Sequence, residues 1–242
     1  MPSIDDLIPV ADTSAFIFTG SVARSAASTV PTLSVDAATI VVSVEDVVKG
    51  PPGLRALRGQ EVTVQLLQPL AEGRYVFLAD FLAVGEGIAV RERTHLEAAA
   101  EKQVRAAVER GYARLIERRV EAAFLVALGT VGAVRPLLPP AQRRGRVPWA
   151  TAPFNIERVL KGRGKPRHMT LIGPGTASKR LPRAPALRAE LHAILILQHP
   201  PADALELLPE EEREKAAFIA EPPDIQPHER LEAILKIVGA PE

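Results

Sequence analysis

The sequence predicts a mainly β protein with some helix (α+β), made of two tandem copies of one small five-stranded barrel, each followed by a helix. A seven-residue motif occurs twice, at 44–50 and at 156–162, and both copies run from alternating apolar residues into a Lys-Gly turn. The segments that flank the two copies also match. The chain has 242 residues, enough for two domains of ordinary size.

The first copy is expected to occupy residues 1–94. Segments rich in Val, Ile, Thr and Phe, with apolar residues at alternating positions, are typical of half-buried strands, and Gly and Pro between them favour turns. The Lys49-Gly50-Pro51-Pro52-Gly53 run is a strong interruption. The expected strands are 15–22, 33–48, 61–66, 74–79 and 88–90.

A helix is expected over 96–120, in a segment (95–121) that links the two copies. Apolar residues recur there at helical spacing, for example at Val104, Val108 and Leu115. Glu101 and Arg105 stand four residues apart in the favourable order. Gly111 lowers the helix propensity of the middle, so a kink or break at this point is an open alternative.

The second copy is expected over residues 122–242. The expected strands are 123–131, 149–160, 169–173 and 190–197, with Pro- and Arg-rich loops between them. The acidic segment 209–219 is expected to be helical. A last helix begins with Pro227 in its first turn and stops at Gly239.

A small closed barrel of about five strands, repeated, indicates an OB-like fold. The order of motifs further resembles the netrin-like OB fold, the inhibitory domain of tissue inhibitors of metalloproteinases and of bacterial relatives. The resemblance covers about residues 14–92 and rests on Phe18, Gly20, Val22, Val44, Val47, Lys49, Gly50, Val62, Val64, Gly73, Tyr75 and Phe77.

The resemblance continues over about residues 122–198, although Ala189-Glu190-Leu191-His192 stands where the first copy has Gly-x-Tyr. In the inhibitors, an N-terminal cysteine chelates the metal of the target protease. This sequence has no cysteine, so the resemblance implies the fold and not that activity.

Composition and motifs argue against several classes of protein. Without cysteine there is no disulfide scaffold and no thiolate metal site. The five histidines show no metal-ligand spacing, and no phosphate loop or nucleophile elbow is present. No catalytic, cofactor-binding or metal-ligating residues are therefore predicted, and an enzyme is the least favoured class. The acidic N-terminus and the lack of a long apolar run predict a cytoplasmic protein without a membrane segment.

Charge is strongly segregated along the chain, although the net charge is only +1. Residues 135–188 hold 13 Lys and Arg and one acidic residue, whereas residues 189–242 hold 4 and 12. We expect the basic stretch to form a partner-binding face. Its candidate residues are Arg143, Arg144, Arg146, Arg158, Lys161, Arg163, Lys165, Arg167, Lys179, Arg180 and Arg183.

Two functions follow from this face. The preferred hypothesis is a non-enzymatic structural or adaptor protein that mediates protein-protein assembly, either with a protein partner or by self-association through opposite charges. The alternative is a protein that binds single-stranded nucleic acid, with Trp149 and Phe154 as candidates to stack on bases. Pairing of the arginines with the acidic tail of their own chain is also open. The recurring Lys49 and Lys161 are interpreted as parts of a structural turn.

Overall fold

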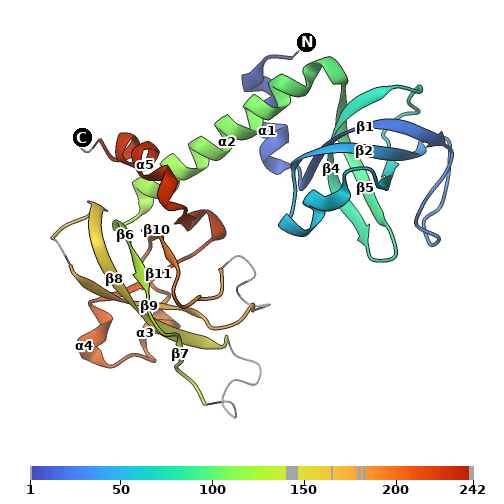
Figure 1. The fold of residues 1–242 in the computed structure, drawn as a ribbon. Helices are drawn as coiled ribbons and strands as arrows, with labels where there is room; N and C mark the ends of the chain where they lie inside the picture. The colour runs from blue at the N-terminus through green and yellow to red at the C-terminus, as the bar shows by residue number, and fades with distance from the viewer. Residues whose placement is uncertain (1, 140–146, 165, 179–180, 182–183, 240–242) are drawn as a thin grey trace. The chain divides into compact units, whose positions relative to one another are not determined.

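The computed structural model describes residues 2–139, 147–164, 166–178, 181 and 184–239. The chain forms two compact units, residues 1–114 and 115–242 (Figure 1). Both contain a sheet and helices, so the mixed α+β class is confirmed. Within the described residues, no helix is long and apolar enough to cross a membrane.

Unit 1 begins with a helix and continues into five strands and a long helix. Ser3 caps the first helix, since its hydroxyl accepts from the Asp6 N–H while the Asp6 carboxylate accepts from the Ser3 N–H. The elements are α1 (Ile4–Thr13), β1 (Phe16–Ser25), β2 (Thr39–Lys49), the 3₁₀ helix η1 (Pro52–Leu57), β3 (Glu61–Gln65), β4 (Arg74–Val84), β5 (Ile88–Glu97), the 3₁₀ helix η2 (Ala98–Ala100) and α2 (Glu101–Ala122), whose residues from Leu115 onward belong to unit 2.

The five strands of unit 1 form a closed barrel in the order β1-β2-β3-β5-β4. All neighbours are antiparallel except β3 and β5, which are parallel. Inside, the rings of Phe16, Phe18 and Phe77 stack in a row, with centroids 4.8 and 5.2 Å apart. Outside, α1 and the first half of α2 cover the sheet around Ile17, Val76 and Leu78.

The α2 helix is continuous from Glu101 to Ala122, so Gly111 does not break it. An added Cβ at this position would lie 2.1 Å from Asp12 Oδ1, the end of an exposed side chain that can turn aside. The strand expected near residues 88–90 is longer than the sequence indicates, because β5 continues to Glu97 and includes Leu96, which the helical spacing places in the helix.

Unit 2 has a larger sheet and shorter helices. Its elements are β6 (Leu125–Val131), β7 (Arg135–Pro136), β8 (Trp149–Lys161), β9 (His168–Pro174), β10 (His192–Leu197), α3 (Ala202–Leu205), α4 (Glu210–Arg213), β11 (Ala216–Phe218), the 3₁₀ helix η4 (Pro222–Asp224), β12 (Ile225–Gln226), the 3₁₀ helix η5 (His228–Arg230) and α5 (Leu231–Val238).

The sheet of unit 2 has the order β11-β9-β8-β6-β10-β12, with β7 beside β8. A second closed five-stranded barrel is thus not confirmed, because continuous pairing in the described residues gives a sheet with two ends. One bridge joins β11, at one end of the sheet, to Gln198 directly after β10, and in it Gln198 and Phe218 exchange two backbone hydrogen bonds of 2.9 Å. The acidic segment 209–219 is also corrected, since only Glu210–Arg213 is helical and Ala216–Phe218 is a strand.

The first strands of the two units nonetheless share one register. Ile17 opposes Lys49 in unit 1, and Val126 opposes Lys161 in unit 2. Gly20 opposes Val44, and Gly129 opposes Ile156, with a β-bulge just before each glycine. The parallel pair β3 and β5 corresponds to the parallel pair β9 and β11. The duplicated motif is therefore a duplicated hairpin with the same irregularities.

The difference lies in the fifth strand. In unit 1, β5 pairs along β4, with Asp80 opposite Arg91 and Phe77 opposite His95. In unit 2 the corresponding partners of β10 are two separate pieces, Phe218 at the end of β11 and Ile225 in β12. Residues 219–224 interrupt the strand between them. The sequence carries no signal for these two strands, because each is too short to show alternating apolar and polar residues.

The C-terminal helix follows the expectation with a small shift. Pro227 caps the 3₁₀ helix η5 rather than starting the α-helix, and α5 begins at Leu231. Gly239 ends α5 in the left-handed conformation, with φ of 68°, and its N–H donates back to the last turn.

Candidate functional site

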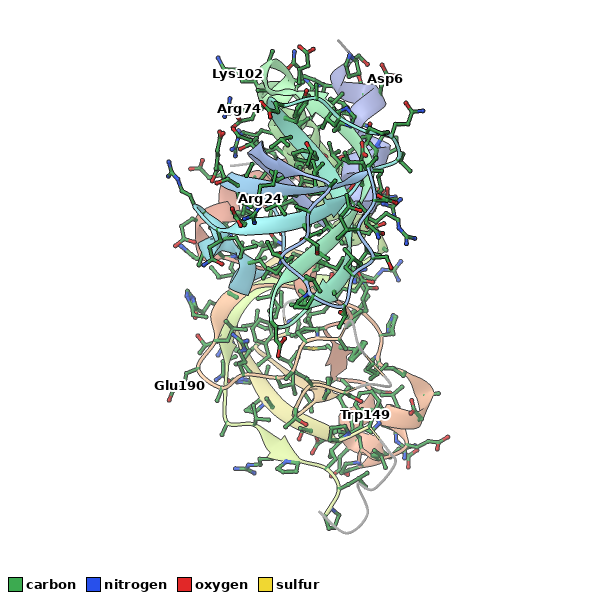
Figure 2. The ribbon with its side chains drawn as sticks, turned by 90° about the vertical axis from the view of Figure 1, so that its right-hand side faces the viewer. Asp6, Arg24, Arg74, Lys102, Trp149 and Glu190 are labelled. Carbon is green, nitrogen blue, oxygen red and sulfur yellow. The ribbon has the colours of Figure 1, made fainter. Side chains whose placement is uncertain are left out.

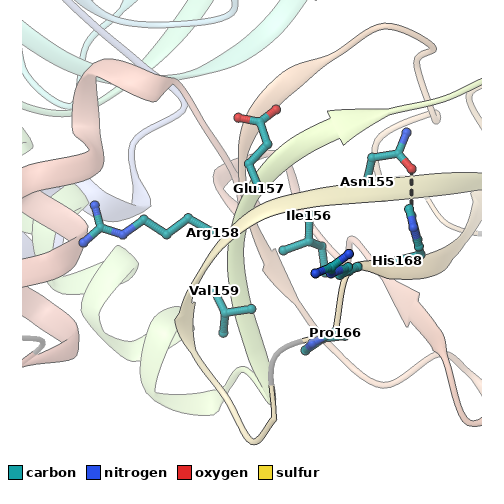
Figure 3. A pocket seen from close by; sticks show the side chains of 8 residues that line it. Asn155, Ile156, Glu157, Arg158, Val159, Pro166 and His168 are labelled. Carbon is teal, nitrogen blue, oxygen red and sulfur yellow. Dashed lines mark hydrogen bonds between the residues drawn. The ribbon is translucent and has the colours of Figure 1, made fainter.

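An open groove of about 940 Å³ lies over β8 and the start of β9 in unit 2 (Figure 3). The groove has an apolar part, with Ile156, Val159 and Pro166, and a polar part. The polar lining consists of Asn155, Glu157, Arg158, Arg167 and His168.

Three side-chain hydrogen bonds hold Asn155, His168 and Glu157 of the groove in place. Asn155 Oδ1 lies 3.0 Å from His168 Nδ1 across the strand pair, as the dashed line in Figure 3 marks. Glu157 accepts a 3.2 Å hydrogen bond from the Thr130 hydroxyl, and its other oxygen lies 3.1 Å from His192 Nε2. The His192 contact is the main reason why the pKa of Glu157 is lowered. His192 in turn stacks on His228.

The same cluster occurs in unit 1 with other residue types. Glu45 occupies the bulge position that Glu157 occupies in unit 2, and it accepts a 2.6 Å hydrogen bond from the Ser21 hydroxyl. Arg74 stands where unit 2 has His192 and forms an ion pair with Glu45. Ser21 lowers the pKa of Glu45 most strongly, and Arg74 lowers it further. Figure 2 marks Arg74 among the side chains of unit 1.

The charged residue beside the bulge has opposite signs in the two units. Asp46 opposes Thr19, and Arg158 opposes Leu128 at the corresponding position. Asp46 is neutralised within unit 1 by Arg105, which also binds Glu101. Arg158 has no ion-pair or side-chain hydrogen-bond partner among the described residues. The groove therefore presents an unneutralised guanidinium where unit 1 presents a closed network of ion pairs.

The expected basic face is brought together only in part. Arg158 and Arg167 line the groove, whereas Arg163 lies in the turn between β8 and β9, exposed to solvent. Lys161 is not available as a binding cation, because its ammonium group donates to three backbone carbonyls at 2.7–2.9 Å. Outside the described residues lie Arg143, Arg144, Arg146, Lys165, Lys179, Arg180 and Arg183.

The aromatic residues that were candidates for base stacking are buried. Trp149 is 4% exposed and packs edge-on against Phe218, and Figure 2 labels it within unit 2. Phe154 is fully buried in the centre of the core. Neither ring offers a face to a base, because Phe154 lies in the main core cluster and Trp149 lies in a second buried cluster on the opposite face of β8. The stacking role expected for these two residues is therefore corrected.

Pairing between the basic stretch and the acidic tail is not seen for the arginines of the groove. The buried Asp224 of the tail binds Arg119 of α2, and Glu221 lies 3.3 Å from the same guanidinium. Asp224 and Glu221 of the tail thus pair with a helix residue outside the basic stretch. This leaves Arg158, Arg163 and Arg167 without an acidic partner in the described part of the chain.

Sequence reasoning missed Asn155, Glu157, His168 and His192 as parts of the site. Alternation along β8 places Asn155 and Glu157 on the outer face, which is a usable signal. The contact of Glu157 with His192 depends on β6 lying between β8 and β10, so it has no local signal.

The described residues contain no group of three or more His, Asp or Glu side chains arranged to hold a metal ion. No protein-family model matches the chain. No curated protein is significantly similar to it.

Proposed function

We propose that this protein is a non-enzymatic adaptor made of two copies of one OB-type barrel, and that unit 2 binds an acidic protein surface through the groove on β8 and β9. The observation that carries the proposal is Arg158, a guanidinium without a described partner at the position where unit 1 holds the neutralised Asp46. The acidic surface belongs to a second copy of this chain or to another protein.

The barrel assignment is supported by the strand order of unit 1 and by the shared register of the two hairpins. It is also supported by the bridge between Gln198 and Phe218, which joins the end strand β11 to the residue after β10 in unit 2. The resemblance to the netrin-like fold is part of this proposal and concerns the fold alone. We also propose that the protein is cytoplasmic.

The mixed lining of the groove favours a protein over a nucleic acid. A single strand is usually held by a basic channel with exposed aromatic rings that stack on the bases. Here Glu157 would face the phosphates, and Trp149 and Phe154 are buried. An acidic protein surface with some apolar side chains fits the apolar part of the groove as well as the arginines.

Light scattering during size-exclusion chromatography tests the proposal, with absorbance at both 260 and 280 nm and at low and high salt. We expect a species larger than the 26.0 kDa monomer at low salt, with a protein-like absorbance ratio, which dissociates at high salt. The double variant Arg158→Glu with Arg167→Glu should weaken this association by about tenfold or more.

The control is Arg188→Glu, which makes the same Arg-to-Glu change at one exposed position. Arg188 lies between β9 and β10 and does not line the groove. It should leave the association unchanged. A species rich in 260 nm absorbance that loses this absorbance at high salt would instead support the nucleic-acid function. A chain that stays monomeric at low salt and does not retain an added acidic peptide would overturn the proposal.

A further inference from the structure

The chain covers part of the outer face of the unit 1 barrel with a strap of its own, residues 27–30 between β1 and β2. Thr63 of β3 lies beneath the strap and is fully buried. Its Oγ1 accepts a 2.8 Å hydrogen bond from the Thr29 N–H and lies 2.9 and 3.3 Å from the hydroxyl oxygens of Thr29 and Ser28. The strap is therefore held on the sheet by a cluster of hydroxyl groups centred on Thr63.

Thr63 belongs to a row of three directly opposed residues on this face. Val62 and Val64 belong to the barrel core, so alternation turns Thr63 outward. The row runs across β2, β3 and β5 through Val41, Thr63 and Ala89. Unit 2 has the same row across β8, β9 and β11, through Pro153, Thr170 and Ala216. The two rows correspond, because Val41 and Pro153 each stand three residues before the residue that opposes the glycine at the bulge.

The row is open in unit 2. Val41 and Thr63 are both 0% exposed, whereas Pro153 is exposed and Thr170 is half-buried. The Thr170 N–H donates to the carbonyl of Lys215 at 2.9 Å, but its hydroxyl has no hydrogen-bond partner in the part of unit 2 that the structure describes. Thr170 thus leaves free the hydroxyl group that Thr63 uses to hold the strap.

The open row continues the groove of unit 2. Asn155 and His168, which line the groove, are the next opposed pair on the same face of β8 and β9 (Figure 3). On the other side, Lys215 directly precedes β11, is exposed and has no ion-pair partner among the described residues. Because Lys215 and the arginines of the groove flank the row, an acidic segment is favoured on this face.

We propose that this open row binds an extended segment of the acidic partner, in which a Ser-Thr pair hydrogen-bonds to Thr170 as Ser28 and Thr29 do to Thr63. The inference rests on the proposed function, because it names the partner segment that lies beside the groove of Arg158. A second copy of this chain does not supply the segment, since its single Ser-Thr pair is bound to its own Thr63. The segment therefore comes from another protein.

Two fluorescent peptides test the inference with the full chain. Both carry acidic flanks of equal charge, and their centres are Ser-Thr-Val, as in residues 28–30, or Ala-Ala-Val. In anisotropy titrations, wild type should bind the Ser-Thr-Val peptide about fivefold more tightly, which is the effect of one hydrogen bond of ordinary strength.

Thr170→Val keeps the shape of the side chain and removes its hydroxyl. It should weaken binding of the Ser-Thr-Val peptide by about fivefold and leave the Ala-Ala-Val peptide unchanged, so that the two affinities become equal. Thr176→Val makes the same change at an exposed position after β9 and should alter neither affinity. Thermal unfolding followed by circular dichroism verifies that Thr170→Val keeps the fold.

Equal affinity of wild type for the two peptides, or a Thr170→Val variant that still prefers the Ser-Thr-Val peptide, would overturn the inference. Weaker binding of both peptides by the Arg158→Glu, Arg167→Glu variant would then show that the proposed function holds without it. If neither peptide binds wild type, the inference and the binding proposed for the groove fail together.

Discussion

Lys49 and Lys161 occupy the same register position in the two units, and each caps the C-terminal end of the helix that precedes its sheet. Lys49 Nζ donates to the carbonyls of Ala11 and Asp12 at the end of α1. Lys161 Nζ donates to those of Val120, Glu121 and Ala123 at the end of α2. Such carbonyls have no partner within the helix and carry the negative end of its dipole.

Removing either ammonium group should destabilise the protein. We expect Lys49→Met and Lys161→Met each to lower the free energy of unfolding by about 1–2 kcal/mol, because methionine keeps the apolar stem and loses the cap. Urea unfolding followed by circular dichroism measures this. Lys102→Met, at an exposed position of α2, is the control and should change little. Equal stability of all three variants would show that the two caps contribute nothing.

Gly20 and Gly129 allow the close approach of the paired strands at the bulge. An added Cβ would lie 2.5 Å from Ser43 O at the first site and 2.2 Å from Asn155 O at the second. Both contacts are with backbone, which cannot rotate away. Gly20→Ala and Gly129→Ala should therefore each cost about 3 kcal/mol, above the loss of a typical substitution.

Gly85→Ala is a suitable comparison for these glycines, because no atom lies within 4 Å of its added Cβ. It should leave the thermal midpoint nearly unchanged. The idea of a shared, sterically fixed bulge would be contradicted if Gly20→Ala and Gly85→Ala had the same midpoint.

The bulge carboxylates predict an acid-dependent contribution to stability. The pKa of Glu45 is lowered by the Ser21 hydroxyl and by Arg74, and that of Glu157 is lowered mainly by His192. A carboxylate with a lowered folded pKa stabilises the fold above its unfolded pKa, and this stabilisation is lost as pH falls through the folded pKa. Wild type should thus exceed Glu45→Gln in stability at neutral pH by about 0.5 kcal/mol at most.

This difference should disappear as pH falls from 4.5, the ordinary pKa of a Glu side chain, to the lowered pKa of the folded protein. Unfolding of wild type and Glu45→Gln between neutral and acidic pH measures it. The control is Glu72→Gln, at an exposed bend, which should track wild type across the range. A gap between wild type and Glu45→Gln that grows on acidification would contradict the assignment.

Asp224 anchors residues 219–224, which interrupt the fifth strand of unit 2, to α2. Its carboxylate is fully buried, binds the Arg119 guanidinium and accepts from the N–H groups of Ala220 and Glu221. Asp224→Ala should cost about 3–5 kcal/mol, because it leaves the partly buried Arg119 without its main partner. Asp203→Ala, an exposed change in the same unit, should cost far less in the same denaturation assay.

The sequence was informative where structure is locally encoded. Period-two alternation predicted the strand around Val62, and the match to the first copy predicted the strand around Ile194. The Lys-Gly motif predicted a repeated hairpin. It failed at the fifth strand of unit 2, where two short pieces, Ala216–Phe218 and Ile225–Gln226, owe their conformation to neighbours distant in the chain. The sequence also does not show that Trp149 is buried, because the elements that cover each face of a strand are distant in the chain.

The sequence predicted the positive charge of the candidate site but not the arrangement of its side chains. Counting basic residues selected Arg158 and Arg167, which do line the groove. It also selected Lys161, whose role as a helix cap requires the preceding helix to end beside the turn. The cluster of Glu157 with His192 depends on three strands lying side by side, so sequence spacing alone does not reveal it.

The central claim is that unit 2 binds an acidic protein surface rather than nucleic acid. It is tested most directly by fluorescence anisotropy of the full chain with two labelled probes of equal net charge, an acidic peptide and a single-stranded oligo-dT. We predict tighter binding of the peptide, and loss of this binding in the Arg158→Glu, Arg167→Glu variant but not in Arg188→Glu. Tighter binding of oligo-dT, lost in the same double variant, would contradict the claim.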